Sequence, residues 1–184
     1  RQMCIETGLR YDLCSIDFDP ETGRFGDRVN CLYEASAKGK SVSFPRVSPD
    51  GRYLLFRQSD YGNFSIWHPE SDLYLLELAN GKIHELSSVN SKDVDSFHTW
   101  SSSGKWFVFS SKRLDGLWAR PFFAHFNPTT GQASKPFLLP QKDPHFYETF
   151  TRTYNLPELV KAPVSDQKAS VSYTHLTLPT NSRV

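Results

Sequence analysis

The chain has 184 residues, of which 38% are hydrophobic and 14% aromatic, and its formal net charge is +1. This composition predicts a folded domain with a sizeable core rather than a disordered chain. The small net charge and the scattered basic residues exclude strong bulk attraction to nucleic acid or to an anionic membrane. Because no apolar run approaches the roughly 20 residues that cross a bilayer, we expect no transmembrane segment.

Three cysteines, Cys4, Cys14 and Cys31, have no metal-ligand spacing. The simplest interpretation is that they are small, buried apolar residues. A Cys14–Cys31 disulfide is the alternative in an oxidising compartment, and the sequence does not decide between the two states. The chain begins at Arg1 rather than Met and shows no signal peptide, so we expect its natural start to be missing.

The first predicted unit, residues 9–36, contains a single hairpin. Its sequence is YDLCSIDFDPETGRFGDRVNCLY at 11–33, with apolar stretches on both sides of a turn from Pro20 to Gly23. Pro and Gly favour such a turn because Pro fixes φ near −65° and Gly accepts positive φ.

The second unit, residues 41–88, contains two hairpins. The segment FPRVSPDGRYLLF at 44–56 has an apolar strand on each side of a Ser-Pro-Asp-Gly turn that ends at Gly51. A second hairpin at 72–86 turns at Asn80-Gly81, one of the strongest short hairpin signals. The stretch RYLLF is apolar at most positions, which predicts a strand buried on both faces.

The third unit, residues 95–140, repeats this design. FHTWSSSGKWFVF at 97–109 aligns with 44–56 at an offset of 53 residues, so that Phe97 matches Phe44 and Gly104 matches Gly51. Its second hairpin, at 121–139, turns between Pro128 and Gly131.

Four strands per unit at a period near 50 residues predict the blades of a β-propeller. The fold class is therefore all-β, a β-propeller fragment of about two and a half four-stranded blades with a short C-terminal helix. Single blades cannot bury both faces of their sheets, so neighbouring blades must stack around a central channel. We expect missing N-terminal blades to close the ring.

The Ser-Pro-Asp-Gly hairpin resembles the repeat of the TolB-like β-propeller family. Six residues match that motif, namely Ser48, Pro49, Asp50, Gly51, Leu55 and Phe56. The resemblance covers residues 9–140 of a partial propeller domain predicted at 1–140, although the third unit has Ser where the motif has Pro and Asp. It implies a bacterial protein of the periplasm or cell envelope that contacts other proteins, while blades of this family also occur in peptidase gating domains and lyases.

Residues 141–169 are predicted to form a C-terminal helical extension. Asp143-Pro144 is a suitable helix start, and Phe146, Phe150 and Tyr154 then recur on one helical face. Residues 170–184 are predicted to be a non-native tail, because VSYTHLTLPT at 171–180 resembles a translated sequencing adapter. A Thr-rich strand is the alternative reading of that tail.

Two long loops, 57–71 and 110–121, follow the second strands of the two complete units and are predicted to share one face. Aromatic and Arg side chains in loops are typical of binding surfaces. The candidates are Asp60, Tyr61, Phe64, Trp67, His68, Arg113, Trp118 and Arg120. The alternative is that these side chains fold back onto the blades and pair locally.

Arg46 and His98 lie on first strands, which line the channel of a propeller, so they are further binding candidates. The chain contains none of the common nucleophile, phosphate-loop or metal motifs, and we predict no catalytic residues, no metal ligands and no cofactor. The sequence favours a non-catalytic module that binds a protein or a glycan. The alternative is a lyase-like enzyme acting on carbohydrate with channel-facing His and Arg and a metal site.

Overall fold

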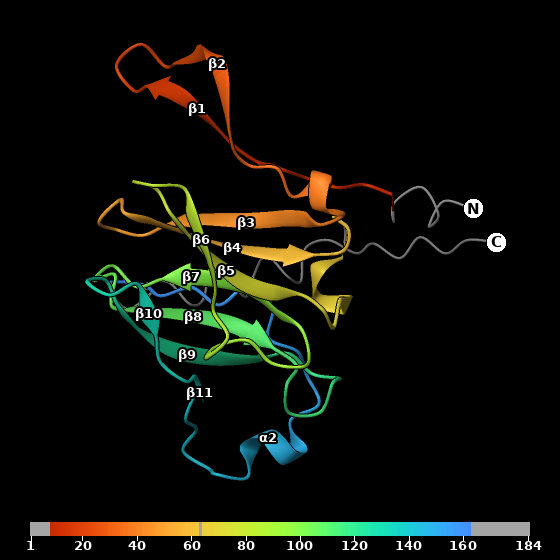
Figure 1. Ribbon diagram of the computed structural model, residues 1–184. Helices are drawn as coiled ribbons and strands as arrows, with labels where there is room; N and C mark the ends of the chain where they lie inside the picture. Colours follow the sequence, from red (N-terminus) through yellow and green to blue (C-terminus); the bar gives the residue numbers. More distant parts are fainter. Residues whose placement is uncertain (1–7, 63, 163–184) are drawn as a thin grey trace, which may run out of the picture.

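The computed structural model describes residues 8–62 and 64–162, and its regular structure is almost entirely antiparallel β-sheet (Figure 1). The elements are β1 (Leu13–Asp19), β2 (Arg24–Tyr33), η1 (Ser36–Lys38), β3 (Ser41–Val47), β4 (Tyr53–Ser59), η2 (Ser65–Trp67), β5 (Asp72–Glu77), β6 (Lys82–Glu85), β7 (Asp95–Trp100), β8 (Trp106–Ser111), β9 (Arg120–Asn127), β10 (Gln132–Ala133), β11 (Phe137–Leu138) and α2 (Phe146–Thr149).

The strands are arranged in three antiparallel sheets. β1 and β2 make a hairpin, β3-β4-β5-β6 make a four-stranded sheet in chain order, and β7-β8-β9-β10 follow the same path with β11 also paired to β9. A meander of four antiparallel strands is the blade of a β-propeller. The expectation of an all-β propeller fragment with a short C-terminal helix is therefore confirmed.

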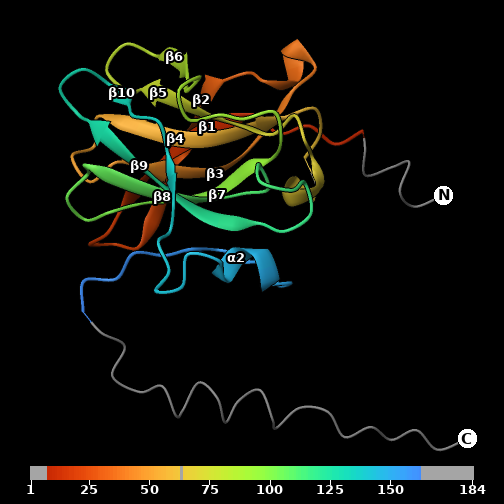
Figure 2. The same ribbon diagram turned by 90° about the horizontal axis from the view of Figure 1, so that it is seen from below.

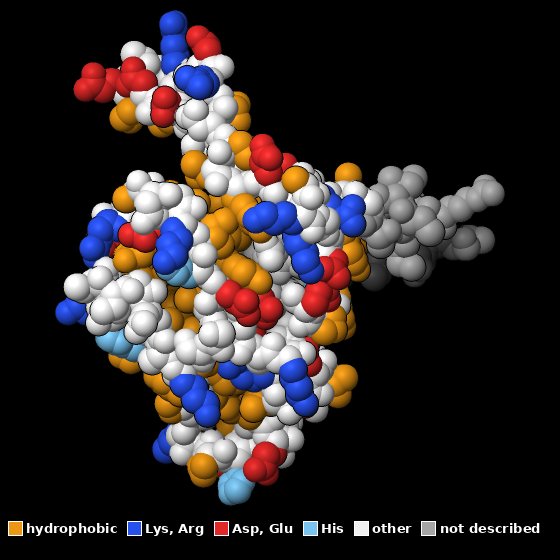
Figure 3. All heavy atoms as spheres, viewed as in Figure 1, with side chains coloured by type: hydrophobic (Ala, Val, Ile, Leu, Met, Phe, Trp, Pro, Cys, Tyr) orange, Lys and Arg blue, Asp and Glu red, His pale blue; other side chains and the backbone are white. Residues whose placement is uncertain are grey.

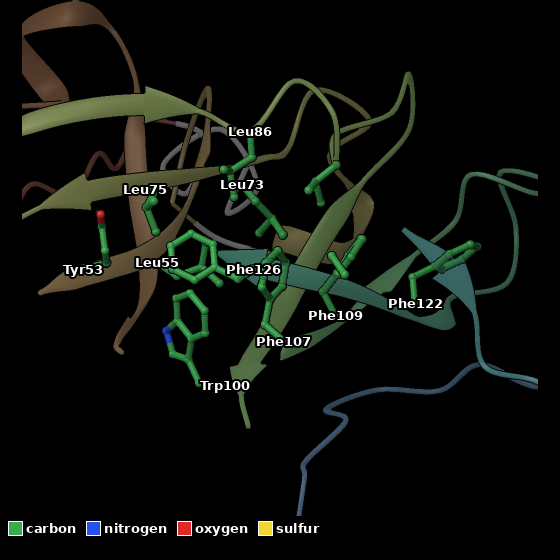
Figure 4. Close-up of a cluster of buried hydrophobic side chains, with 12 residues drawn as sticks. Tyr53, Leu55, Leu73, Leu75, Leu86, Trp100, Phe107, Phe109, Phe122 and Phe126 are labelled. Atoms are coloured by element: carbon green, nitrogen blue, oxygen red, sulfur yellow. The ribbon is translucent and has the colours of Figure 1, made fainter. Parts of the chain in front are cut away.

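The two complete sheets lie face to face and share one core (Figure 4). Tyr53 and Leu55 of β4 pack in a cluster with Phe107 and Phe109 of β8. The alternate β4 residue Phe56 belongs to a second cluster, which also contains Leu13 of the first hairpin. Since every residue of β4 is buried, the prediction of a strand covered on both faces is confirmed.

The matched turns share their hydrogen bonds as well as their sequence. In the second unit, the Ser48 hydroxyl accepts a bond of 3.0 Å from the Tyr53 backbone N–H. In the third unit, the Ser101 hydroxyl accepts the same bond from Trp106 at 3.2 Å. In both units the serine hydroxyl accepts a hydrogen bond from the first N–H of the following strand. This shared bond explains why the third unit forms the same turn without Pro and Asp.

The tight turns and the long loops lie at opposite ends of the strands. In Figure 1 the turns between β3 and β4 and between β7 and β8 are at the left edge, whereas η2 and the loop 112–119 are at the right edge. The shared face that the topology predicts for the two long loops is therefore present. We call it the loop face.

The β1–β2 hairpin projects away from the stacked sheets (Figure 1). Ile16, Phe18, Phe25 and Val29 on its strands are all exposed, and orange side chains cover part of it in Figure 3. Only residues near its base, among them Leu13, Leu32 and Tyr33, pack with the second unit.

The C-terminal segment differs from its prediction. The helix α2 ends at Thr149, so Tyr154 does not lie on it, and α2 sits outside the third sheet (Figure 2). The reason is that Arg120 donates hydrogen bonds to the backbone carbonyls of Phe150 and Arg152, which holds this stretch extended against the blade. The three aromatic residues are nevertheless neighbours, although only Phe146 lies in α2. The centre of the Phe150 ring is 4.7 Å from that of Phe146 and 5.4 Å from that of Tyr154.

The predicted tail 170–184 lies outside the described residues. Within the described part, none of the helices has the length and the apolar character that a membrane crossing requires.

Candidate functional site

A pocket of about 340 Å³ lies where the inner strands of the two complete blades meet the loop after β4. We call it the loop pocket. Its lining combines aromatic rings with small residues: Ser43, Phe44, Gly62, Phe64, Ser65, Ile66, Trp67 and Phe97. Two larger hollows lie beside β2 and between β6 and β10, and neither contains any of the sequence-predicted site residues.

The loop pocket concentrates backbone strain. In the described part of the chain, the non-glycine residues with positive φ are Phe44 (55°), Phe64 (53°) and Phe97 (53°), and all three line this pocket. A bulky residue in the left-handed region is a genuine outlier that persists only when its surroundings enforce it. Such outliers cluster at binding and catalytic sites, so the strain marks this pocket rather than the larger hollows.

Trp67 and Phe64 form the exposed wall of the loop pocket, with exposed fractions of 70% and 66%. The Lys112 ammonium lies 3.7 Å from the centre of the Trp67 ring, which is a cation–π contact between the two long loops. Burial lowers the pKa of Lys112, and the nearby carboxylates of Asp93 and Asp115 oppose this shift. The contact holds the indole in place while leaving most of it accessible.

The other candidates of the first long loop support its shape. His68 is 1% exposed, its Nδ1 lies 2.9 Å from Glu70 Oε1, and its ring centre is 3.9 Å from that of Tyr61. Asp60 forms an exposed ion pair of 2.6 Å with Lys40. The pair links the residue before β3 to the residue after β4. Neither Asp60 nor His68 lines the loop pocket.

Sequence reasoning missed Arg57, which is fully buried in β4 next to this site. Arg57 is the cross-strand partner of Ser43, which lines the loop pocket, and its Nη2 donates to the Ser59 hydroxyl. Its Nε and Nη1 and the Ser43 hydroxyl have no hydrogen-bond partner among the described residues. The detectable signal was an Arg directly after the apolar run 53–56, beside a buried strand where a charge is rare unless it is paired.

Burial lowers the pKa of Arg57 to about 10, and Glu70 opposes this shift. The guanidinium therefore stays protonated at neutral pH. A cation thus lies at the base of the blade interface, beside an aromatic pocket.

His98 lies inside the interface between the blades. It is 2% exposed, and its Nε2 is 3.0 Å from the Leu55 carbonyl oxygen. Burial lowers the pKa of His98 to about 4, so the ring is neutral at pH 7. Arg46 is exposed, and its backbone carbonyl accepts a 2.9 Å bond from the Trp100 indole.

Arg113 binds the start of its own blade and the segment that leads into it. Its Nη2 lies 2.7 Å from Asp95 Oδ1 and 2.7 Å from the Val89 carbonyl, while its guanidinium covers the Phe122 ring at 4.7 Å. Asp95 is fully buried, and burial raises its pKa whereas Arg113 lowers it. This pair connects the start of β7 to the loop after β8.

Arg120 and Trp118 also lie away from the loop pocket. Arg120 is 1% exposed and carries the C-terminal segment through its bonds to Phe150 and Arg152. Trp118 is half-buried, and its backbone N–H donates to the Asp115 side chain. The structure thus brings Tyr61, Phe64, Trp67 and His68 together and separates them from the arginines of the second loop.

The described residues contain no group of three or more His, Cys, Asp or Glu side chains arranged to hold a metal ion. The chemistry that the loop pocket offers is accordingly that of aromatic faces, small hydroxyls and nearby cations.

No protein-family model matches the chain, and no curated protein matches it. Among solved structures the chain is similar to a luciferin-regenerating enzyme, at 16% identity and a TM-score of 0.48 over 77% of this chain. It is also similar to TolB from Acinetobacter baumannii, at 20% identity and a TM-score of 0.40, and to a candidate dipeptidyl aminopeptidase IV from Bacteroides ovatus, at 12% and 0.38, each over 65% of this chain. The chain spans 43%, 25% and 23% of those three structures, so it corresponds to less than half of each. Similarity at this level assigns neither a family nor a function.

Proposed function

We propose that this chain is a non-catalytic binding module of a TolB-like β-propeller protein, which binds a protein or glycan partner at its loop pocket. The observation that carries the proposal is the convergence of Phe44, Phe64 and Phe97, all with positive φ, on one pocket. Each such residue costs about 1–3 kcal/mol, and the fold retains three of them in one place.

The exposed aromatics give this pocket its binding capacity. Trp67 and Phe64 present flat apolar surfaces, and such side chains supply most of the energy at protein interfaces. Lys112 already occupies part of the Trp67 face, so the free remainder of the ring and Phe64 are the surfaces left to a partner.

The periplasm or cell envelope of a bacterium is the location that we propose. Its support is the resemblance of the Ser48–Gly51 hairpin to the TolB-like repeat. Further blades complete the ring in this proposal. The exposed apolar residues of the β1–β2 hairpin, such as Phe18 and Phe25, favour it because an uncovered apolar sheet face is a stacking surface.

The burial and neutral charge of His98 favour a binding function over a catalytic one. A lyase-like enzyme acting on carbohydrate needs a histidine that reaches its substrate or metal. His98 is buried, bound to the Leu55 carbonyl and neutral at pH 7.

The test compares Trp67→Ala and Phe64→Ala with Leu117→Ala, a matched variant of an equally exposed apolar residue in the second loop. Binding is measured on an array of bacterial envelope polysaccharides, and with a photo-crosslinking residue at position 64 against an envelope protein fraction. We expect a loss of roughly 10- to 30-fold for the two pocket variants, no loss for Leu117→Ala and unchanged melting temperatures.

The two arms distinguish a glycan from a protein, because only a protein yields a specific cross-linked band that disappears in Trp67→Ala. The proposal would be overturned if Trp67→Ala and Phe64→Ala bound as tightly as Leu117→Ala. It would also be overturned if Leu117→Ala were the variant that lost binding while the two pocket variants kept it.

A further inference from the structure

The two thiols of the projecting hairpin lie opposite each other. Cys14 of β1 is the cross-strand partner of Cys31 of β2, and both residues are exposed. Directly opposed residues of an antiparallel pair have Cα atoms about 4.5–5.5 Å apart and point to the same face. Disulfides form at Cα separations of about 4.4–6.8 Å, so this register meets the geometric requirement.

The Cys31 thiol is directed toward the strand that carries Cys14. Desolvation and a hydrogen bond with the Cys14 thiol raise the pKa of the Cys31 thiol. The Cys31 thiol also lies 3.9 Å from the Leu13 carbonyl oxygen, which orients it across the hairpin toward β1. The structure therefore places two accessible thiols directly opposite each other on neighbouring strands, whereas sequence spacing alone left their relation open.

We propose that Cys14 and Cys31 form an intramolecular disulfide when the protein meets a disulfide oxidant such as oxidised glutathione. One cysteine thiolate attacks a sulfur of the oxidant, forms a mixed disulfide and releases one reduced glutathione. The second cysteine thiolate attacks the protein sulfur of that mixed disulfide and releases the second glutathione. The two protons lost by the cysteines end on the two reduced glutathiones, so atoms and electrons balance.

The cross-link would act on the least supported part of the fold. The hairpin contacts the second unit mainly near its base, and the exposed apolar residues of its strands lie beyond the Cys14–Cys31 pair. A bond at this base removes conformational freedom from the opened hairpin and fixes the pairing of β1 with β2. Ile16, Phe18, Phe25 and Val29 then stay on one face, because a slip by one residue would turn them to the other side.

The experiment treats the purified full chain with oxidised glutathione and identifies the products by mass spectrometry of non-reduced peptides. We expect a Cys14–Cys31 cross-linked peptide, and a protein mass lower by two hydrogen atoms, in the wild type and in Cys4→Ser. Cys14→Ser should carry a glutathione adduct on Cys31 instead. Cys4 lies outside the described residues, so its variant is the control for a different pairing.

Hydrogen exchange supplies a second readout. In Cys4→Ser, oxidation should slow the exchange of backbone amides in β2, such as that of Val29, by roughly tenfold or more. In Cys14→Ser, the same treatment should leave these exchange rates unchanged. Two separate glutathione adducts on Cys14 and Cys31 without a cross-link would overturn the proposal, and so would a cross-link from Cys4 to either of them.

Discussion

The rings of Phe44 and Phe97 meet edge to face, with centroids 5.1 Å apart and planes at 74°. The two residues occupy the same position in consecutive blades and share a left-handed backbone, with φ of 55° and 53°. Each lies where the pairing of its strand with the next one shifts, between Ser43 and Arg46 and between Ser96 and Thr99. The repeat therefore encodes a strained bulge that turns one aromatic ring of each blade toward its neighbour.

The left-handed backbone at Phe44 should reverse the usual order of stability of its glycine and alanine variants. Glycine in a strand is normally less stable than alanine by about 0.5–1 kcal/mol. At positive φ, alanine retains a penalty of about 1–2 kcal/mol that glycine avoids. We expect Phe44→Gly to unfold at higher urea concentration than Phe44→Ala. The control is Phe137, a half-exposed strand residue without positive φ, where the alanine variant should be the more stable; alanine ranking above glycine at Phe44 as well would contradict the bulge.

Gly51 tests the turn that defines the repeat. Its φ is 71°, and a Cβ built on it meets no atom within 4 Å, so backbone conformation alone penalises a side chain. We expect Gly51→Val to lower the free energy of unfolding by about 2 kcal/mol, measured by chemical denaturation. Gly51→Asn should cost clearly less, because Asn tolerates the left-handed region. Equal losses for Val and Asn would show that something other than φ is responsible.

Arg113 tests whether a predicted binding residue maintains the blade. Removing it leaves the fully buried Asp95 carboxylate without its cation, which costs about 3 kcal/mol. We therefore expect Arg113→Ala to unfold well below the wild type in a thermal melt. The double variant Arg113→Met with Asp95→Asn should recover part of the loss, because it removes both charges. A melting temperature of Arg113→Ala equal to that of the wild type would refute this structural role.

Asp72 makes stability depend on pH. Burial, followed by the neighbouring Asp95 carboxylate, raises the pKa of Asp72 to about 6, and its Oδ1 is buried with no hydrogen-bond partner among the described residues. The folded state thus binds the Asp72 proton more tightly than the unfolded state, whose pKa is 3.8. This contribution to stability is present below pH 3.8 and is lost as pH rises through 6.

Asp72→Asn should therefore be more stable than the wild type by about 1 kcal/mol at pH 7, and the difference should vanish near pH 4. His98 acts in the opposite direction, because its lowered pKa destabilises the fold as pH falls from 6.5 toward 4. Its effect is common to both proteins and cancels when they are compared at the same pH by urea denaturation. A difference that stays constant across this range would exclude Asp72 as the titrating group.

Much of the candidate site could not be read from local patterns. Trp67 and Phe64 could be named because exposed loops with aromatic residues are recognisable in sequence. Arg57 was missed because the pattern places it at the start of the loop 57–71, whereas β4 continues to Ser59 and buries it. Arg113 and Arg120 were grouped with the loop aromatics by loop membership, whereas Asp95 and the carbonyls of the C-terminal segment hold them elsewhere.

The chain's own residues specify the blades, because strand, turn and alternation are local properties and Gly51, Gly81, Gly104 and Gly131 each supply the positive φ that a tight turn requires. They also indicate which strand is covered on both faces, since β4 begins with the uninterrupted apolar run 53–56. The end of α2 depends on the bonds of Arg120 to the backbone of Phe150 and Arg152. The position of the loop pocket and the burial of Arg57 depend on the stacking of one blade against the next. These contacts join residues more than 40 positions apart, such as Leu55 with His98, and only the packed molecule determines which polar groups meet there.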